Sequence, residues 1–344
     1  MLPASLPEPV LFRPGQGEPV LRWGILGTGW IAGEFAHAVQ AHTAQKVAAV
    51  GSRSDERARQ FAGQHGIDRA HGTEDALIED PGVDVVYVAS PPGEHLAQGL
   101  RAIAAGKHVL MEKPLATSAA DARTLVAAAR AAGVFLMEAM WSRYQPQALV
   151  IGELLRDGVL GDIRTVHADL GQAVAPDPHG RLFRPDLGGG ALLDMGIYPI
   201  QLDSMVRGTP RSFVTSGGLT STGVDAHAIL LADHGTGEPS VLTTSLQTRT
   251  PAAALIAGSE ARIEIATPFH VPGGFRLAPN DYLAETITWT DPTGITFFGG
   301  LSWEATALAR YVGEGRQESP LHTHDETVSI LATIDEARRQ IGAR

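Results

Sequence analysis

The stretch LRWGILGTGWIA, residues 21–32, joins a short apolar run to a glycine-rich turn and decides the fold of the first part of the chain. Residues 21–26 have the length and composition of a buried strand, and residues 31–41 those of a helix. Between them, Gly27 permits a tight bend, and Gly29 lets the main chain approach a pyrophosphate closely. An anion there would meet the free N–H groups and the positive dipole end of the helix. This placement favours a dinucleotide-binding turn over an ordinary tight turn.

Apolar strands and helical patterns alternate from residue 21 to about residue 140, which predicts a Rossmann-type, doubly wound parallel sheet. The run 83–89 is almost wholly apolar, as expected of a strand covered on both faces. The other strands expected in this part are 46–51 and 108–111, and the expected helices are 94–105 and 118–132.

Beyond residue 160 several segments alternate with period two, as in an antiparallel sheet with one packed face. We therefore predict an α/β protein with a Pro-rich arm (1–20), an NAD(P)-binding Rossmann domain (21–140), and an α+β domain for substrate binding and oligomerisation (141–344). The second domain should hold a large, mostly antiparallel open sheet, and the last helices could pack back on the Rossmann domain. The expected strands are 163–170, 226–232, 240–246, 261–265 and 285–290, and the expected helices are 191–207, 302–312 and 325–340.

Charge and composition limit the partners. A formal net charge of −11 and the lack of a basic run argue against a nucleic acid or an anionic membrane. No apolar stretch approaches about 18 residues, and the N-terminus lacks the basic region of a secretory signal, so a cytoplasmic location is expected. With no cysteine, thiolate metal sites and thiol catalysis are excluded. Among 27 basic residues only Lys46, Lys107 and Lys113 are lysines, so a lysine in a suspected site suggests a group that must lose its proton.

The residues at the end of the second strand indicate which dinucleotide binds. A site for NAD usually has an acidic residue about 20 residues beyond the glycines, where it holds the ribose 2′-hydroxyl. Here Ser52, Arg53 and Ser54 stand at that place. The guanidinium offers a planar, charged fork to a 2′-phosphate, and a serine adds a hydrogen bond, so NADP is favoured. Asp55 and Glu56 follow directly and keep NAD as the alternative if the strand ends later.

Two further strand ends fall at the same edge of the predicted sheet. The strand 83–89 ends in Ser90-Pro91-Pro92, and the strand 108–111 runs into Glu112-Lys113-Pro114. Ligands bind at the carboxyl edge of doubly wound sheets. A residue before proline favours an extended backbone, so Pro114 would keep Lys113 out of a helix and let it point into the crevice.

Five motifs now stand together: residues 27–32 (GTGWIA), 90–95 (SPPGEH), 112–114 (EKP), 141–144 (WSRY) and 188–198 (GGGALLDMGIY). Their combination resembles the Gfo/Idh/MocA oxidoreductase family, the group of glucose–fructose oxidoreductase and inositol dehydrogenase, over nearly the whole chain after residue 20. Glu-Lys-Pro is the most specific of them. The resemblance implies a Rossmann domain, a mixed α/β domain whose open sheet often serves as a subunit interface, NAD(P) as cofactor, and catalysis by the lysine of Glu-Lys-Pro.

Many members of the family end the last motif with a histidine, where this chain has Tyr198. That departure, with Trp-Ser-Arg-Tyr, is similar to the dimeric dihydrodiol dehydrogenases and the related NADP-dependent D-xylose dehydrogenases. It weakens any transfer from the inositol dehydrogenases. The strand ends and the resemblance together give the expected cofactor contacts: Gly27, Thr28, Gly29, Trp30, Ile31, Ala32, Ser52, Arg53, Ser54, Ser90, Pro91, Pro92, His95, Glu112, Lys113, Trp141 and Arg143.

Hydride transfer from a secondary alcohol requires a group that accepts the hydroxyl proton, and Lys113 and Tyr198 are the candidates. We expect Tyr198 to exchange the proton and Lys113 to hydrogen-bond the same oxygen, although the roles could be reversed. Asp194 lies four residues before Tyr198 on the expected helix and so shares its face. It either orients the site, caps the helix start or contacts the substrate.

The leading expectation is an NADP-dependent dehydrogenase for a sugar, polyol or trans-dihydrodiol. Residues 172–184 are the candidates for substrate recognition. One alternative is a glycosidase of the same fold that keeps NAD bound and cleaves through transient oxidation. Another is a non-catalytic dinucleotide sensor, against which the presence of both Lys113 and Tyr198 speaks. The resemblance also implies a homodimer or homotetramer through the open sheet.

Four other polar residues have alternative interpretations. His95 resembles a family position near the cofactor, or is a helix-end side chain. Arg143 clamps the cofactor or substrate, or pairs with a carboxylate. His322 and His324 suggest a metal, but Thr323 and Asp325 beside them are typical of a helix cap, and no metal is expected.

Overall fold

The computed structural model describes residues 2–3, 5–281 and 283–344 and divides the chain into two compact units. We call Phe12–Tyr144 with Phe297–Val328 the parallel-sheet unit. Met1–Leu11, Gln145–Thr296 and Ser329–Arg344 form the mixed-sheet unit. The division falls four residues after the predicted boundary at 140, and residues 297–328 group with the parallel sheet. Residues 1 and 4 of the predicted arm lie outside the described residues.

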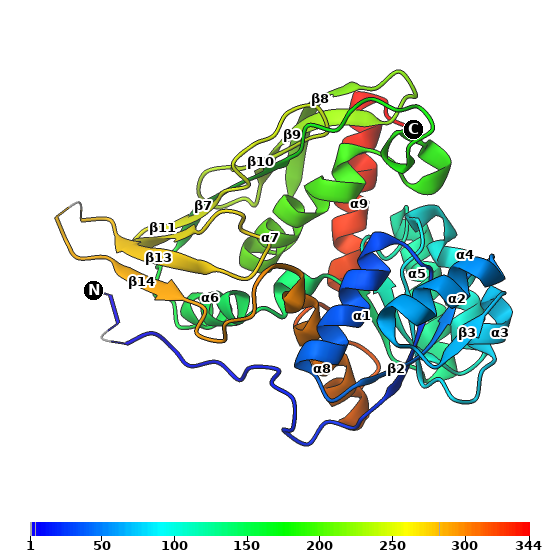
Figure 1. Cartoon of the computed structure of the whole chain (residues 1–344). Coiled ribbons are helices and arrows are strands. Elements are labelled where there is room, and N and C mark those ends of the chain that lie inside the picture. The colour runs from blue at the N-terminus through cyan, green and yellow to red at the C-terminus, as the bar shows by residue number, and fades with distance from the viewer. Residues whose placement is uncertain (1, 4, 282) are drawn as a thin grey trace. The chain divides into compact units, whose positions relative to one another are not determined.

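The parallel-sheet unit has the predicted Rossmann architecture. Its six strands are all parallel in the order β3-β2-β1-β4-β5-β6, with the switch point between β1 and β4. Figure 1 shows the helices of this unit around the sheet. The strands are β1 (Arg22–Leu26), β2 (Lys46–Gly51), β3 (Arg69–His71), β4 (Val85–Val88), β5 (His108–Glu112) and β6 (Leu136–Ala139). The helices are α1 (Trp30–His42), α2 (Asp55–His65), α3 (Glu74–Ile78), α4 (His95–Ala104) and α5 (Ala119–Ala132).

Apolar and aromatic side chains hold the sheet and its helices together. All four residues of β4 are buried, which explains the continuous apolar run in the sequence. Phe35 of α1 stacks on Tyr87 of β4 with ring centroids 3.9 Å apart, and Trp23 of β1 lies 5.4 Å from Phe35. Such aromatic pairs contribute about 0.5–1.5 kcal/mol each beyond their buried area. This cluster fixes α1, and with it the glycine-rich turn, against the middle of the sheet.

The C-terminal part of this unit adds a second layer. A short 3₁₀ turn (Phe297–Gly300) leads into α8 (Leu301–Gly313), and both pack on α1. Nearly all of α8 is buried. The segment after α8 runs into α9 (His324–Ile341), which starts in this unit and ends in the other.

The mixed-sheet unit contains the predicted large, mostly antiparallel sheet. Its eight strands follow the order β14-β13-β12-β11-β7-β10-β9-β8, and only the β7–β10 pair is parallel among the described residues. The strands are β7 (Ile163–Gly171), β8 (Ser212–Leu219), β9 (Asp225–Asp233), β10 (Ser240–Ser245), β11 (Ala254–Gly258), β12 (Ala261–Ile265), β13 (Gly274–Pro279) and β14 (Ile287–Thr290). The helices before and over this sheet are α6 (Pro146–Arg156) and α7 (Ile197–Arg207).

One face of this sheet is packed and the other is open. Burial alternates along β9, β10, β11 and β12, and α7 packs on β7 and β10 (Figure 1). On β9 the side chains of Ile229 and Leu231 point to the other face, where they are 46% and 42% exposed. The period-two alternation in the sequence therefore corresponds to a sheet with one covered face, as predicted.

The segment predicted as one helix over 191–207 is not a continuous α-helix. Leu192–Gly196 forms a π-helical turn, and α7 begins only at Ile197. Asp194 lies in the π turn and Tyr198 in the first turn of α7, so the α-helical spacing assumed from the sequence does not apply between them. Turns of this kind are frequent at functional sites.

Candidate active site

The glycine-rich turn has the geometry of an anion-binding cradle. Gly27 has φ +113°, and a Cβ there would come within 2.8 Å of the Ala89 carbonyl oxygen. A Cβ on Gly29 would meet no described atom within 4 Å, because this residue faces open space. Gly29 is also the N-cap of α1, which receives no side-chain cap from the described residues and has no acidic residue in its first turn. The first amides of α1 are thus available to an anionic ligand.

A cavity of about 380 Å³ opens in front of this cradle, at the carboxyl edge of the parallel sheet. Its size lies within the usual range for small-molecule and cofactor sites. Eight of the predicted cofactor residues line it, namely Gly27, Thr28, Gly29, Ser52, Arg53, Ser54, Ser90 and Pro91. Three other polar residues of its lining were missed by sequence reasoning, namely Arg57, Glu74 and Gln98.

The residues after β2 place positive charge at one end of the cavity. Arg53 is exposed and lies 3.6 Å from Glu94, at the outer limit of an ion pair. Ser54 caps α2 by accepting a hydrogen bond from the amide of Arg57, 3.3 Å away, so its hydroxyl already has a role. Arg57 brings a second guanidinium to the same lining. The serine cap three residues earlier is the signal in the sequence that could have indicated Arg57.

Two acidic residues near this end, Asp55 and Glu74, have partners other than Arg53 and Arg57. Asp55 pairs with Arg59 at 2.7 Å along α2, and neither Asp55 nor Glu56 is among the described lining residues. Glu74 does line the cavity, but its carboxylate accepts hydrogen bonds from Arg101 and from Gln98.

The other predicted cofactor residues are not among the described lining residues of this cavity. Trp30 is 62% exposed and lies edge-on to Phe298, while Trp141 is buried and stacks on the same ring at 5.7 Å. Ala32 and Pro92 are buried, and Ile31 is half-buried. Arg143 donates to Glu326 at 3.1 Å and to the carbonyl of Leu321, which is the carboxylate-pairing alternative. The partners of Arg143 are about 180 residues away, and no local pattern pointed to them.

The Glu-Lys-Pro motif follows β5 at the same edge of the sheet. The Tyr87 hydroxyl donates to Glu112 Oε1 at 2.5 Å, and the Lys113 amide donates to Glu112 Oε2 at 3.1 Å. Lys113 itself is half-buried. Glu304 of α8 is buried nearby, where burial first and the charge of Glu112 second raise its pKa well above the ordinary value. Both effects favour the protonated, uncharged form of Glu304 beside Glu112.

His95 links the two neighbouring strand ends. Its Nε2 lies 3.0 Å from the Ser90 carbonyl oxygen, and its Nδ1 lies 2.9 Å from the Pro114 carbonyl oxygen. Complete burial lowers the pKa of His95, although the two carbonyl contacts act in the opposite direction. A neutral ring has one N–H and can donate to only one of them. His95 thus holds the backbone beside Ser90 and Lys113.

The second set of predicted catalytic residues belongs to the mixed-sheet unit. Gly190, with φ +114°, precedes the π turn, and the amide of Leu192 donates to the buried carboxylate of Asp225 at 2.6 Å. Asp194 accepts a hydrogen bond from Arg181 at 2.8 Å. Tyr198 is buried, with its ring 4.8 Å from that of His270. Arg181, in the loop predicted to recognise the substrate, thus contacts a predicted catalytic side chain.

His322 and His324 have protein partners rather than the geometry of a metal site. His322 pairs with Glu138, and His324 contacts the carbonyl oxygen of Leu136. The Glu326 amide donates to Thr323 Oγ1 at 3.2 Å, which confirms the predicted cap of α9. No group of three or more metal-ligating side chains occurs among the described residues.

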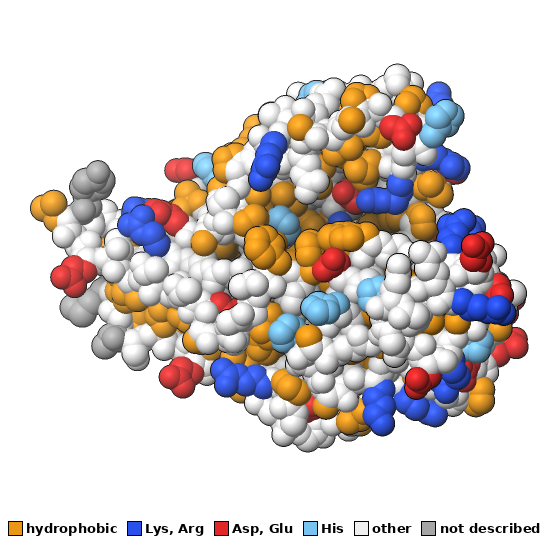
Figure 2. Space-filling model, in the orientation of Figure 1, with side chains coloured by type: hydrophobic (Ala, Val, Ile, Leu, Met, Phe, Trp, Pro, Cys, Tyr) orange, Lys and Arg blue, Asp and Glu red, His pale blue; other side chains and the backbone are white. Residues whose placement is uncertain are grey.

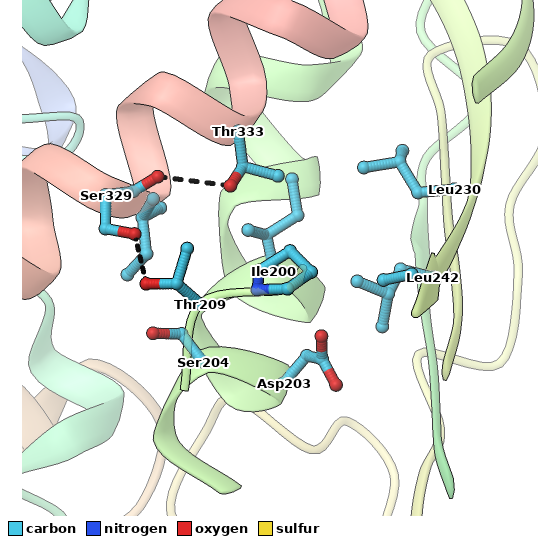
Figure 3. Close-up of a pocket in the computed structure, with 11 residues that line it drawn as sticks. Ile200, Asp203, Ser204, Thr209, Leu230, Leu242, Ser329 and Thr333 are labelled. Atoms are coloured by element: carbon cyan, nitrogen blue, oxygen red, sulfur yellow. Dashed lines mark hydrogen bonds between the residues drawn. The ribbon is translucent and has the colours of Figure 1, made fainter. Parts of the chain in front are cut away.

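A second cavity, in the mixed-sheet unit, is too small for a substrate. It lies between α7, α9 and the strands β9 and β10, where Ser329, Thr209 and Asp203 approach it (Figure 3). Its volume of about 10 Å³ holds about one water molecule. We assign it no role in substrate binding.

The surface of the parallel-sheet unit carries mixed charge. Figure 2 shows basic and acidic side chains interspersed over the helices of this unit on the face in view. Within the described part of the chain, no helix is long and apolar enough to cross a lipid bilayer.

Comparison with known proteins places this geometry in a family. The profile described as "Oxidoreductase family, NAD-binding Rossmann fold" matches residues 21–140, and that of the "GFO/IDH/MocA C-terminal domain" matches residues 149–264. Trans-1,2-dihydrobenzene-1,2-diol dehydrogenase of Danio rerio is 37% identical over 94% of this chain and 97% of its own length.

Two solved structures share the fold of the whole chain. The 3-ketoreductase KijD10 of Actinomadura kijaniata, in complex with NADP and TDP-benzene, is 28% identical over 95% of this chain and 98% of its own, with a TM-score of 0.81. Aldose-aldose oxidoreductase of Caulobacter crescentus, complexed with glycerol, is 26% identical over 94% and 98% of the two chains, also with a TM-score of 0.81.

The chain therefore belongs to the Gfo/Idh/MocA oxidoreductase family. It is an NAD(P)-dependent oxidoreductase with a Rossmann nucleotide-binding fold. The resemblance stated from its five motifs is confirmed.

Proposed function

We propose that the protein is an NADP-dependent dehydrogenase or reductase acting on a secondary alcohol or carbonyl of a sugar, polyol or trans-dihydrodiol. The observation that carries the proposal is the 380 Å³ cavity in front of uncapped α1, with Arg53 and Arg57 in its lining. The names of the relatives, a dihydrodiol dehydrogenase, a 3-ketoreductase and an aldose oxidoreductase, support this substrate range.

The cradle residues would hold the pyrophosphate, and Arg53 with Arg57 would hold a 2′-phosphate. When bound, the nicotinamide ring supplies a site that accepts or donates a hydride. In the oxidative direction the carbinol carbon loses a hydride and the hydroxyl oxygen loses a proton, so that a carbonyl forms. We assign acceptance of that proton to Tyr198 and a hydrogen bond to the same oxygen to Lys113. Asp194, held by Arg181, orients the site from the π turn.

A reduction screen tests the function directly. Purified protein is given NADP⁺ or NAD⁺ with a panel of aldoses, polyols and trans-dihydrodiols, and reduced cofactor is followed by absorbance. Steady reduction of NADP⁺ with at least one of these alcohols is expected. Cleavage of a glycoside without net reduction would instead indicate the redox-assisted glycosidase. A protein that binds NADP⁺ and turns over none of the panel in either direction would indicate a sensor.

Replacement of Arg53 by alanine should weaken NADP selectively. The change removes a charged fork from the cavity, and hydrogen bonds to charged groups contribute about 1.5–3 kcal/mol each. The KM for NADP⁺ should rise about 10- to 100-fold, whereas that for NAD⁺ should change by less than about 3-fold. Both constants are measured with the same alcohol at saturation.

Arg59→Ala is the matched control, because Arg59 lies on the same helix, pairs with Asp55 and is outside the described cavity lining. It should leave both constants close to those of the wild type. Equal KM changes for NADP⁺ and NAD⁺ in Arg53→Ala would contradict recognition of a 2′-phosphate.

We also propose that a second copy of the chain covers the open face of the mixed sheet. Val214 on the edge strand β8 lies opposite Leu231 of β9, and Ile229 follows on the same face, with exposures of 63%, 42% and 46%. Two-fold symmetry, the commonest symmetry of homo-oligomers, would bring these apolar side chains against the same side chains of the second copy. An apolar patch of this kind on a sheet face is typical of an interaction surface.

Charge placed on this face should dissociate the oligomer. Light scattering after gel filtration should give at least twice the monomer mass for the wild type, and the monomer mass for Ile229→Glu with Leu231→Glu. Gln60→Glu with Gln64→Glu, which adds the same two charges at exposed positions of α2, should leave the mass of the wild type unchanged. A monomeric wild type, or a double variant of wild-type mass, would exclude this interface.

A further inference from the structure

The backbone around Lys113 is held by buried polar side chains on both sides. The Lys113 amide is bound by Glu112, and the Pro114 carbonyl by His95. The amide of Leu115 donates to Glu138 Oε1 at 2.8 Å. Glu138 lies on β6 and is only 3% exposed, so this bond is shielded from water.

The second oxygen of Glu138 is bound by residues from the C-terminal part of the same unit. Glu138 Oε2 lies 2.7 Å from His322 Nε2 and accepts a hydrogen bond from Thr327 Oγ1 at 3.0 Å. The side chains of His322 and Glu138 are 0% and 1% exposed. One buried carboxylate therefore joins the segment after Lys113 to a histidine about 200 residues later in the chain.

The charges around His322 favour its protonated form. Burial lowers the pKa of His322, but the hydrogen bond with Glu138 and the nearby carboxylate of Glu326 outweigh burial and raise that pKa above the ordinary value. Glu326 of α9 lies 3.4 Å from Nδ1 of His322, and Arg143 is held 3.1 Å from Glu326. Arg143 acts in the opposite direction and lowers the pKa of His322. The His322 ring thus lies between two carboxylates, an arrangement that favours its protonated form.

We propose that Glu138 and protonated His322 form a positioning pair that fixes the Lys113–Leu115 segment, so that loss of the His322 proton loosens this segment and slows turnover. The inference rests on the proposed function, in which Lys113 contacts the reacting oxygen. His322 and Glu138 are positioning residues, because they act through the backbone at Leu115. Loss of the proton would leave the buried carboxylate of Glu138 and the partly buried carboxylate of Glu326 near each other with Arg143 as the remaining cation, which disfavours the present arrangement.

The direction of the pH dependence follows from the raised pKa. The His322 proton, and the stabilisation it brings, is fully present below about pH 6.5, the ordinary value for histidine. Both are lost as the pH rises through the pKa of His322 in the folded protein, which is higher than the ordinary value. The wild type should therefore show an alkaline decrease in kcat that depends on His322.

The kinetic test compares pH profiles of the NADP⁺-dependent reaction for the wild type and His322→Gln. Glutamine keeps an N–H donor for Glu138 but carries no charge. At pH 6 the kcat of the variant should be about 10-fold lower than that of the wild type. This decrease is smaller than the roughly 10²-fold decrease that follows when a reacting group is misplaced by 1 Å. Its alkaline decrease should be absent, and its KM for NADP⁺ should stay within about 2-fold of that of the wild type.

His324→Gln serves as the matched control. His324 is a buried histidine of the same segment, and it bonds the backbone oxygen of Leu136 at 2.8 Å. A glutamine can keep that bond, so the variant should retain the alkaline decrease. A general loss of packing in this segment would affect both variants, whereas loss of the His322 charge affects one.

A second readout does not depend on activity. In protein labelled with ¹⁵N-leucine, the Leu115 amide resonance, assigned by its loss in Leu115→Ile, should shift with the same midpoint as the ring protons of His322. Glu138→Gln should lower the His322 midpoint and remove the response of Leu115.

Two results would overturn the proposal: superimposable pH profiles of the wild type and His322→Gln, or a Leu115 amide that does not follow the titration of His322. If Lys113→Met keeps wild-type turnover, the proposed role of Lys113 fails instead, while the Leu115 titration still reports whether the pair holds the segment.

Discussion

Lys113→Met should lower kcat by at least about 10²-fold, because the variant loses the ammonium group proposed to hydrogen-bond the reacting oxygen. Methionine keeps most of the apolar stem, and the backbone bonds from Glu112, His95 and Glu138 to this segment do not involve the lysine side chain. The fold of the segment should therefore survive. The measurement is steady-state reduction of NADP⁺ at saturating alcohol, together with a fluorescence titration of NADPH binding.

Lys46→Met is the control for loss of a lysine. Lys46 begins β2 at the opposite edge of the same sheet and is exposed, so its replacement should leave kcat and cofactor affinity near those of the wild type. The Kd for NADPH should change by less than about 3-fold in Lys113→Met. Turnover of Lys113→Met within a few-fold of the wild type would remove Lys113 from the mechanism.

Much of the fold was predictable because its signals are local. The turn at Gly27 and Gly29, the apolar run of β4 and the period-two alternation of β9 each follow from a few neighbouring residues. Their confirmation reflects strong backbone requirements: a Cβ at Gly27 would collide with the end of β4. The π turn before α7 was not predictable, since the sequence there has the spacing of an ordinary helix. The Leu192 amide in this turn donates to Asp225, 33 residues away, and local spacing does not reveal that contact.

The lining of the cavity was predictable where it depends on strand ends, and less so where it depends on contacts between distant segments. Arg53 and Ser90 follow strands whose order is set by the Rossmann pattern, and both line the cavity. Glu74 and Gln98 reach the same cavity from α3 and α4. Their side chains meet each other at 2.9 Å across 24 residues, and helix periodicity alone does not reveal that contact.

His322 shows the same limit. As one of two histidines in the pattern His-Thr-His, it suggested a metal, and only the folded chain shows the Glu138 carboxylate 2.7 Å away. The cap by Thr323 was predictable from the sequence, because a capping side chain accepts a hydrogen bond from an amide only three residues later in the chain. Buried ion pairs between distant segments leave no comparable signal in a single sequence.

Tyr198→Phe should also lower kcat by at least about 10²-fold, because it removes only the hydroxyl proposed to exchange the substrate proton. The ring remains, so its packing 4.8 Å from His270 is kept. The nucleotide cavity is lined by residues of the parallel-sheet unit, and NADPH affinity should change by less than about 3-fold. The measurements are kcat as a function of pH and NADPH binding by fluorescence.

The double variant Lys113→Met with Tyr198→Phe distinguishes a shared role from two separate ones. If both groups act on the same oxygen, their effects are coupled, and the double variant should be less than about 10-fold slower than the slower single variant. If the two roles were independent, the two effects would multiply, and kcat of the double variant would fall by about 10⁴-fold or more. Tyr311→Phe, which removes the hydroxyl of a buried tyrosine of α8, should keep wild-type turnover. Wild-type kcat in Tyr198→Phe would assign the proton to Lys113 alone, and strictly multiplicative effects would contradict action on one oxygen.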